Sequence, residues 1–370
     1  MRRVASSHSI DDFGEDLDSF VTLSSFILTA TEVCPSLAAK GHIKKEEETD
    51  LCILLQSVAT SCKYIQNCVR KLGLANLSGK NGGTTNVQGE QQMKLDVIAH
   101  DVFTRGLDES KRCTMLISEE EEEAIMCTSS PNGRYVCVFD PLDGSSNIDC
   151  CVSVGSIFGV YRVVPTLGTG EGDGVAQCTQ PARSQLAAGY AHHSGATTLV
   201  LAVGDEGSAV EFVLDDDTGA FVVAADGAPL RCPKRGQIYS LNDARFDDWP
   251  EGLRSYVTDA RRGENQTGEQ YSARYVCSLV GDFHRTMKYG GWCGNPRPHL
   301  RLQFEVAPLA FVARAAGAVA TDGLREDLMA NERGPTAAHE RTPLFVGSVD
   351  DVAELLTYGD VRQVAKTYAL

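Results

Sequence analysis

The sequence lacks several patterns that would assign it to common classes of protein. Its longest apolar runs, such as Thr197 to Val203, are much shorter than the ~18 residues that a membrane-spanning helix needs. Lys and Arg number 34 against 50 Asp and Glu, and the formal net charge is −16. Sequence-independent binding to nucleic acid needs clustered cations against phosphates. We therefore expect no membrane partner and no nucleic-acid partner, and an anionic substrate must be met by a local patch or by bound cations.

The cysteines and the first residues also lack processing patterns. The 13 cysteines include no CxxC pair and no histidine at zinc-finger spacing, so we expect reduced, largely buried thiols and no structural zinc. The first twenty residues are rich in acid, and no basic segment is followed by an apolar one. Transit and signal peptides have the opposite composition. We therefore expect a cytoplasmic protein.

The length of 370 residues is enough for about two domains. Residues 1–48 are polar and weakly patterned, and we expect this N-terminal segment to be partly disordered. Pro229 and Pro233 punctuate the chain where composition changes. The expected division is therefore an N-terminal domain over 49–228 and a C-terminal domain over 229–370.

Hydrophobic periodicity predicts helices and strands in alternation. Apolar residues recur at three- and four-residue steps from Leu51 to Leu72, which predicts a helix with one buried face. Further helices are predicted at 94–106, 248–258, 281–289 and 308–317. Strands are predicted at 113–117, 135–139, 156–164, 197–203, 209–214, 220–224, 237–241, 275–280 and 299–306. This alternation is typical of a layered α/β architecture.

Five consecutive glutamates, Glu119 to Glu123, follow the predicted strand 113–117. Blocks of like charge are usually solvated because the charges repel one another. A buried strand can also deliver the first of these carboxylates to a metal site. The run by itself leaves both interpretations open.

The segment FDPLDGSSNID, residues 139–149, ends an apolar strand with two carboxylates three residues apart. Asp140, the Leu142 carbonyl and Asp143 can converge on one hard cation, because Mg²⁺ prefers oxygen ligands in a compact octahedron. The residues that follow can open a helix whose free N–H groups bind a phosphate: Gly144, Ser145 and Ser146. An Asx turn with a serine N-cap is the alternative.

This string resembles the fructose-1,6-bisphosphatase family, and the resemblance covers roughly residues 49 to 355. The other matching segments, in the family's order, are TNVQGEQQMKLDV (85–97), ISEE (117–120), VSVGSIFGVYR (152–162), AAGYA (187–191), YSLN (239–242), ARYVCSLVGDFHRT (273–286) and LRLQFE (300–305). The wider superfamily, which includes inositol monophosphatases, shares the DPxDG core. The continuation Asn147 to Asp149 favours fructose bisphosphatase over its sedoheptulose-bisphosphatase relative. The resemblance implies a two-domain α/β/α/β/α sandwich, assembled as a homotetramer.

By this resemblance, divalent-metal ligands come from both domains. They are Glu90, Glu119, Asp140, Leu142 through its carbonyl, Asp143 and Glu305. Glu90 stands where the family often has aspartate. Alternation in the predicted strand 299–306 places Glu305 beside Arg301 on the face away from the core, where the pair alone would be interpreted as a surface ion pair. Two or three Mg²⁺ per subunit are implied, with Mn²⁺ or Zn²⁺ as substitutes.

The implied reaction is Mg²⁺-dependent hydrolysis of the 1-phosphate of fructose 1,6-bisphosphate, giving fructose 6-phosphate and phosphate, as in gluconeogenesis. Closely spaced cations can activate the attacking water and hold the leaving oxygen. They also neutralise a carboxylate cluster that would otherwise repel itself. By resemblance, Asp96 and Glu120 orient and deprotonate the water. A shift of these roles by one residue within Glu119 to Glu123 stays open.

The resemblance also implies a set of substrate-binding residues, with three departures from the family's pattern. The set is Asp143, Gly144, Ser145, Ser146, Asn242, Arg245, Arg274, Tyr275, Ser278, Leu279, Asn295, His299 and Arg301. Arg245 and Asn295 stand where relatives carry tyrosine, and His299 replaces a lysine. Histidine is only partly charged near neutral pH. We therefore expect catalysis to be retained and affinity for the sugar to be altered.

The regulatory features of the family are degenerate in this sequence. The position at which animal relatives bind inhibitory AMP reads EEETDL (46–51), whose acids repel a phosphate, although Arg134, Tyr135 and Arg162 are retained. We expect weak or absent inhibition by AMP. The loop 165–184, which corresponds to a cysteine-rich regulatory loop of plastid relatives, has one cysteine, Cys178, so no disulfide can form within it.

Two other functions stay open at this point. The changed sugar-side residues are compatible with a sedoheptulose-1,7-bisphosphatase or another sugar phosphatase of the same superfamily. A non-catalytic descendant is the other alternative, although a carboxylate fills every catalytic carboxylate position.

Overall fold

The computed structural model describes residues 21–33, 45–72, 74, 80–85, 91–168, 176–177, 179–204, 207–224, 227–324, 327–332 and 334–363. The acidic first twenty residues, Glu90 and Cys178 lie outside the described residues, as do the side chains of Glu46 to Glu48. Within the described part of the chain, every helix is too short or too polar to cross a membrane.

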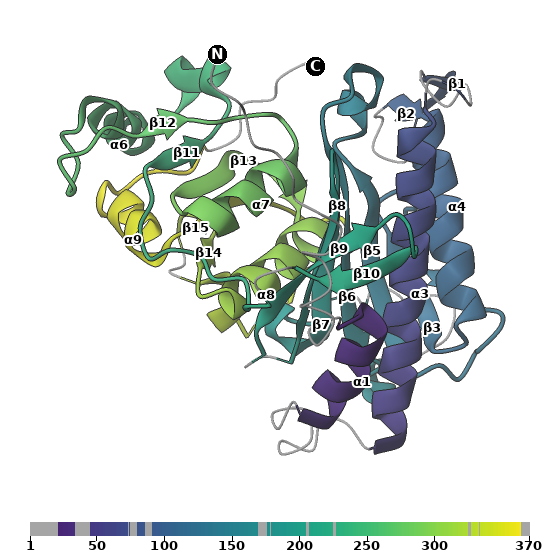
Figure 1. Cartoon of the computed structure of the whole chain (residues 1–370). Helices are drawn as coiled ribbons and strands as arrows, with labels where there is room; N and C mark the ends of the chain where they lie inside the picture. Colours follow the sequence, from purple (N-terminus) through teal and green to yellow (C-terminus); the bar gives the residue numbers. More distant parts are fainter. Residues whose placement is uncertain are drawn as a thin grey trace, which may run out of the picture.

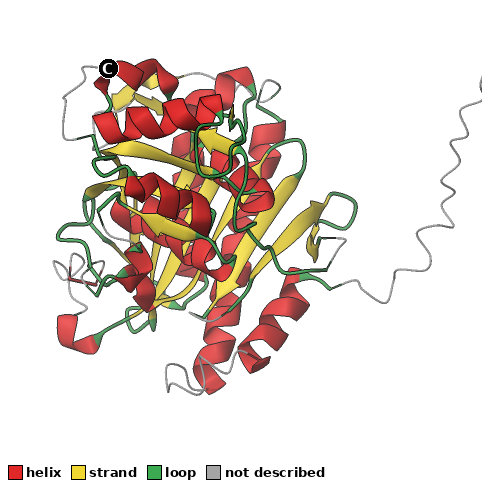
Figure 2. Cartoon of the chain, turned by 90° about the vertical axis from the view of Figure 1, so that its left-hand side faces the viewer, coloured by secondary structure: helices red, strands yellow, loops and turns green. Residues whose placement is uncertain are grey.

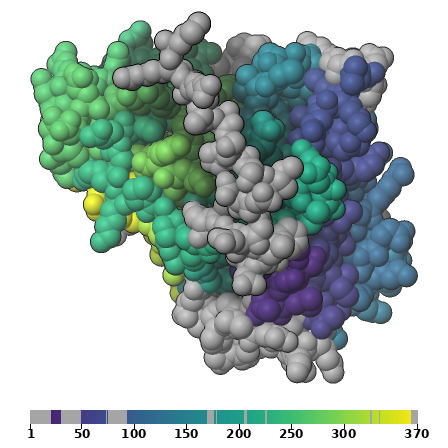
Figure 3. Space-filling view, in the orientation of Figure 1, coloured from purple at the N-terminus to yellow at the C-terminus, as the bar shows by residue number. Residues whose placement is uncertain are grey.

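Three layers of helices alternate with two β-sheets (Figure 1). Helices α1, α3 and α4 cover the outer face of the large sheet, α7 and α8 lie between the sheets, and α6 and α9 cover the small sheet. Figure 2 shows the same layers with the helices over the small sheet toward the viewer. The surface in Figure 3 has the N-terminal helices and the C-terminal half on opposite sides. The predicted α/β/α/β/α sandwich is therefore confirmed.

The helices follow the predicted periodicity with shifted boundaries. They are α1 (Leu23–Val33), α3 (Lys45–Arg70), α4 (Lys94–Glu109), α6 (Glu251–Arg262), α7 (Leu279–Tyr289), α8 (Ala307–Ala315) and α9 (Val349–Thr357). Short 3₁₀ turns are η3 (Ser145–Cys150), η4 (Pro165–Leu167), η5 (Ala182–Ser184), η6 (Asp243–Asp248) and η8 (Leu328–Ala330), and η7 (Leu302–Val306) is a π-helix. The long helix begins at Lys45, before the predicted start, and α1 had no predicted counterpart.

The large sheet has eight strands in the order β10-β9-β8-β7-β6-β5-β3-β4. Their bounds are β3 (Cys113–Ser118), β4 (Ile125–Met126), β5 (Tyr135–Asp143), β6 (Val154–Arg162), β7 (Gln185–His193), β8 (Thr197–Val203), β9 (Ala209–Asp215) and β10 (Ala220–Val223). Neighbours are antiparallel except β3 and β5, which are parallel. The periodicity did not predict β7, a central strand, because its small residues carry little hydrophobic signal.

The small sheet has the order β12-β11-β13-β15-β14. Its strands are β11 (Ile238–Ser240), β12 (Ser272–Ala273), β13 (Trp292–Arg301), β14 (Val319–Thr321) and β15 (Arg341–Gly347), and a separate pair consists of β1 (Lys80–Thr85) and β2 (Gln91–Met93). Helix α8 is buried on nearly all sides because it lies between the two sheets, which explains its alanine-rich sequence.

Two predicted strands are wrong at positions that matter for the site. Residues 275–280 are not a strand, because the Ser278 side chain caps α7 by accepting the Gly281 N–H at 3.2 Å and the Asp282 carboxylate accepts the Val276 N–H at 3.3 Å. Residues 302–306 form the π-helix η7 and do not continue strand β13.

Candidate active site

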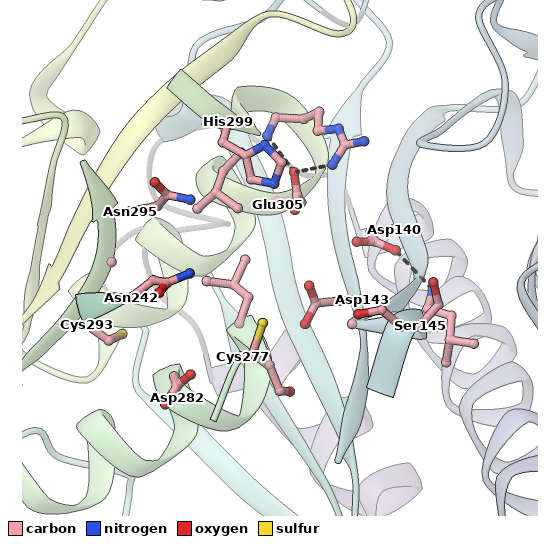
Figure 4. Close-up of a pocket in the computed structure, with 18 of the residues that line it drawn as sticks. Asp140, Asp143, Ser145, Asn242, Cys277, Asp282, Cys293, Asn295, His299 and Glu305 are labelled. Carbon is pink, nitrogen blue, oxygen red and sulfur yellow. Dashed lines mark hydrogen bonds and ion pairs between the residues drawn. The ribbon is translucent and has the colours of Figure 1, made fainter. Parts of the chain in front are cut away.

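A pocket of about 630 Å³ lies between the end of β5 and the small sheet. In Figure 4, Asp140 and Asp143 face Asn242 and Asn295 across this pocket. The structure brings most of the predicted site residues to its wall: Glu119, Asp140, Leu142, Asp143, Gly144, Ser145, Ser146, Asn242, Tyr275, Ser278, Leu279, Asn295, His299, Arg301 and Glu305. The lining therefore comes from both halves of the chain.

Asp140 and Asp143 lie at the end of β5, where its pairing with β6 contains a bulge. Asp140 pairs with Ile157 and Asp143 with Gly155, so three steps along β5 oppose two steps along β6. A bulge bends the strand and changes the direction of its side chains. A carboxylate oxygen of Asp140 accepts the Leu142 N–H at 3.0 Å. The bulge thus fixes a compact turn that presents both carboxylates to the pocket.

The other face of the acidic group comes from the C-terminal half. Oxygen atoms of Asp140, Asp143 and Glu305 all lie within 4.8 Å of one another, and the three residues are buried. Nη2 of Arg301 lies 2.6 Å from Oε1 of Glu119, and Nη1 lies 3.9 Å from Oε2 of Glu305, which also accepts the Arg301 backbone N–H. Arg301 and Glu305 are 5% and 3% exposed, so their interpretation as a surface pair on an alternating strand is wrong.

The electrostatics of this group favour a bound cation. Burial raises the pKa of Asp140 well above its ordinary value, and Glu119, Asp143 and Glu305 raise it further, whereas Arg301 lowers it. Burial also raises the pKa of Asp143 to about 6, against the opposing effects of the Val280 N–H and Arg301. Hard oxygen ligands that repel one another at this spacing fit a divalent cation, which would remove the penalty of burying the charges.

Asp96 and Glu120, the predicted water-activating residues, are buried but do not line the pocket. The Asp96 carboxylate accepts the Met93 N–H at 2.7 Å at the start of α4, and Met93 itself lines the pocket. The backbone N–H of Glu120 donates to the Ser118 hydroxyl at 3.3 Å. The catalytic roles of Asp96 and Glu120 stay predictions.

The sugar side of the pocket is less complete. Arg245 lies outside the main pocket and lines an adjoining crevice of about 40 Å³, which shares Asn242, Tyr275 and Asn295 with it. Arg274 lines neither space, and its guanidinium donates to the Ala273 carbonyl at 3.2 Å. The predicted substrate-binding role of Arg274 has no support from its position in this chain.

Sequence reasoning missed several residues that line the pocket. They are Met93, Asp149, Ser240, Cys277, Asp282, Cys293, Gly294, Arg297 and Leu300. Arg297 lines both the main pocket and the crevice, and it is a cation on the sugar side. Its only sequence signal is its place between Pro296 and Pro298, and the pairing of β13 with β15 is irregular at this point of the strand.

The three residues of the predicted AMP site lie at the far end of β5 from the acidic group. Tyr135 is the first residue of β5 and pairs with Arg162 on β6. Asp50 of α3 lies 2.8 Å from Nε of Arg112 and 3.1 Å from Nη1 of Arg134. An internal carboxylate therefore already neutralises cations at this position.

Two family models match consecutive parts of the chain. The model described as "Fructose-1-6-bisphosphatase, N-terminal domain" matches residues 22–226, and the model described as "Fructose-1-6-bisphosphatase, C-terminal domain" matches residues 232–360. Together they cover most of the 370 residues.

Curated relatives match most of the chain. The chloroplastic fructose-1,6-bisphosphatase of Brassica napus is 41% identical over 335 residues, which are 86% of this chain and 79% of the relative. The chloroplastic enzyme of Pisum sativum is 40% identical over 357 residues, which are 91% of this chain and 83% of the relative.

The chloroplastic relatives contradict the expected cytoplasmic location. That expectation rested on the acidic composition of the first twenty residues, which is a weak guide to the compartment because it describes only one end of the chain. We therefore withdraw it.

Solved structures give the same assignment. The holo form of Leishmania major fructose-1,6-bisphosphatase matches with a TM-score of 0.81 and 34% identity, over 92% of this chain and 99% of that chain. The T-state structure of the same protein matches with a TM-score of 0.77 and 32% identity, over the same shares. The chain therefore belongs to the fructose-1,6-bisphosphatase family.

Proposed function

We propose that this phosphoric monoester hydrolase removes the 1-phosphate of fructose 1,6-bisphosphate in a reaction that depends on Mg²⁺. The observation that carries the proposal is the convergence of three buried carboxylates, Asp140, Asp143 and Glu305, within 4.8 Å in a pocket whose opposite wall offers the amides of Asn242 and Asn295 and the cation of Arg297. Bound cations would neutralise buried acids at this spacing, which otherwise repel one another. Two or three Mg²⁺ per subunit, with Mn²⁺ or Zn²⁺ as substitutes, remain part of the proposal.

The chain's own residues bind and orient the substrate. The N–H groups at the start of η3, from Ser145 and Ser146, adjoin Asp143 and are available to the 1-phosphate. Arg301 lies against Glu119 and keeps a fixed positive charge beside the acidic group. Bound divalent cations would supply the activation of water and the neutralisation of phosphoryl charge. We propose that Asp96 and Glu120 orient and deprotonate that water, because Asp96 accepts the N–H of the lining residue Met93 and Glu120 follows the lining residue Glu119.

The sugar and its 6-phosphate would occupy the opposite wall. Asn242, Asn295 and His299 offer hydrogen bonds there, and Arg297 adds a cation between the pocket and the crevice. Arg245 lines the crevice and not the main pocket, so its guanidinium fits a phosphate contact beside the sugar wall. The altered cations of this wall are the reason to expect altered affinity with retained chemistry.

Phosphate release from fructose 1,6-bisphosphate, measured with Mg²⁺ and with EDTA, tests the proposal. We expect release only with Mg²⁺ and fructose 6-phosphate as the co-product. Faster release from sedoheptulose 1,7-bisphosphate would contradict the assigned sugar, and no release from either sugar would contradict the assigned activity. A homotetramer, also part of the proposal, is tested by sedimentation velocity on the same sample.

A further inference from the structure

A line of buried polar side chains lies behind the bulged turn of β5. Ser156 of β6, His193 of β7 and Gln66 of α3 are 0%, 1% and 4% exposed, respectively. They come from three different elements, and none lines the pocket. Buried polar groups of this kind are costly unless they bond to one another or to the backbone.

The distances connect these side chains to the turn between the two aspartates. The Ser156 hydroxyl donates to the Pro141 carbonyl at 2.7 Å. The Ser156 oxygen lies 3.1 Å from Nε2 of His193, and Nδ1 of His193 lies 3.1 Å from Oε1 of Gln66. A continuous set of contacts therefore runs from helix α3 to the carbonyl of Pro141.

The bulge explains why the Pro141 carbonyl needs this partner. Ser156 is the one residue between Gly155 and Ile157, the partners of Asp143 and Asp140, so it lies opposite the extra residue of β5. A bulge leaves ladder groups unpaired. The Ser156 hydroxyl replaces the missing backbone donor, because it reaches the carbonyl that the ladder cannot.

The single hydroxyl proton sets the direction of the other contacts. Since Ser156 donates its proton to Pro141, its oxygen must accept from Nε2–H of His193. Burial lowers the pKa of His193 to about 3, so the ring is neutral and its Nδ1 accepts. Because Nδ1 then needs a donor, the Gln66 amide takes the orientation in which its NH₂ group, instead of Oε1, occupies the position 3.1 Å from Nδ1. Each donor in the line thus points toward the catalytic turn.

We propose that Gln66, His193 and Ser156 are positioning residues whose hydrogen bonds fix the bulged turn Asp140 to Asp143 and thereby set the affinity of the site for divalent cations. The inference rests on the proposed metal-dependent function. Groups that hold metal ligands in place from behind typically change metal affinity by 10- to 100-fold when they are removed.

The test is Mn²⁺ binding by calorimetry to the metal-free full chain, which needs no substrate. Ser156→Ala and His193→Leu each raise the dissociation constant about tenfold or more. Ser156→Thr retains the hydroxyl, and His193→Gln places an amide nitrogen near Nε2, so both restore most of the affinity. At saturating Mg²⁺, the Ser156→Ala variant keeps a KM for fructose 1,6-bisphosphate near that of the unchanged chain. The reason is that the substitution does not touch the sugar wall, the side of the pocket that holds Asn242, Asn295 and His299.

His192→Leu is the matched control. His192 adjoins His193 on β7, but its ring lies on the other face of the strand, 5.3 Å from the ring of His284. We expect it to leave Mn²⁺ affinity unchanged. Equal losses in His192→Leu and His193→Leu would overturn the proposal, because the effect would then be one of general packing.

The remaining outcomes separate the hydrogen-bonded line of Gln66, His193 and Ser156, called the relay below, from the proposed function. A folded Ser156→Ala protein that binds Mn²⁺ as the unchanged chain does would overturn the relay, even if the chain hydrolyses fructose 1,6-bisphosphate. If Ser156→Ala does not fold, His193→Gln against His193→Leu makes the same comparison. Relay-dependent Mn²⁺ binding without hydrolysis of fructose 1,6-bisphosphate would support the relay and refute the activity.

Discussion

The two walls of the pocket hold their side chains in different ways. On the acidic wall, backbone N–H groups of Leu142, Val280 and Arg301 donate to the carboxylates of Asp140, Asp143 and Glu305, which are all buried. On the sugar wall, Asn242 and Tyr275 are exposed and lie on connections between elements. Main-chain donors therefore fix the proposed metal ligands, whereas part of the sugar wall consists of exposed side chains on connecting segments.

Among the substitutions considered, Asp140→Asn on the acidic wall should have the largest effect on activity. The substitution removes one charge from the cation site, and we expect kcat/KM for fructose 1,6-bisphosphate to fall on the order of 10²- to 10³-fold. The metal-free protein should become more stable, because the carboxylate is buried among other acids. Phosphate release and urea unfolding in EDTA measure the two effects. If the metal-free variant were less stable than the unchanged chain, repulsion between Asp140 and the neighbouring carboxylates would not be destabilising the protein.

The raised pKa of Asp143 on the acidic wall makes the stability of the metal-free protein depend on pH. Its value is about 6 in the folded chain, against 3.8 ordinarily, so between these values the folded state binds more protons than the unfolded state. The metal-free protein therefore loses stability as pH rises from about 4 to about 6, on the order of 2–3 kcal/mol for this shift.

Asp143→Asn is the control for that pH dependence, because it removes the titrating group. Urea unfolding in EDTA at several pH values gives the difference in stability between the unchanged chain and the variant. We expect the difference to grow with pH in favour of the variant and to level off above pH 6. A difference that does not change with pH would refute the effect.

His299→Lys tests how much the charge at this position of the sugar wall contributes to substrate affinity. Lysine is fully charged at pH 8, where an ordinary histidine is mostly neutral. We therefore expect KM for fructose 1,6-bisphosphate at pH 8 to fall several-fold, about 1 kcal/mol for a half-buried charge, with kcat nearly unchanged. Steady-state kinetics at saturating Mg²⁺ measures it. A change in kcat as large as the change in KM would mean that His299 acts in the chemical step, as the acidic wall is proposed to do.

Addition of AMP should change the rate of hydrolysis less than any of the substitutions above. The Asp50 carboxylate already bonds Arg112 and Arg134, so a nucleotide phosphate has to compete with an internal ion pair. We expect inhibition below the roughly fivefold change that marks ordinary allosteric coupling. Rates with and without AMP test this, and Asp50→Asn, which releases the two guanidinium groups, is the informative variant. Inhibition of the unchanged chain by micromolar AMP would contradict the prediction.

The two walls also differ in how far sequence could predict them. Asp140, Leu142 and Asp143 lie in one short segment at the end of an apolar strand, so their proximity follows from local order. Glu305 was placed in the site by resemblance. Its predicted alternating strand was wrong, because a π-turn has no distinctive apolar period and HLRLQFE also reads as a strand.

The sugar wall was less predictable because its contacts depend on how distant connections fold. Arg274 and Tyr275 are neighbours in sequence, yet only Tyr275 lines the pocket. Arg297 reaches it through a proline-flanked irregularity with no regular period. The relay of Gln66, His193 and Ser156 spans three elements, one of which, β7, was not predicted as a strand, so its proximity appears only in the folded chain.

The π-turn η7 makes the length of this segment a functional property. A π-helix carries more residues per turn than an α-helix and is usually the less stable arrangement. Removing one residue from Leu302–Val306 would let the segment join α8 as a regular helix, but it would rotate Glu305 away from Asp140 and Asp143. The length of this turn is therefore tied to the place of Glu305 in the acidic group.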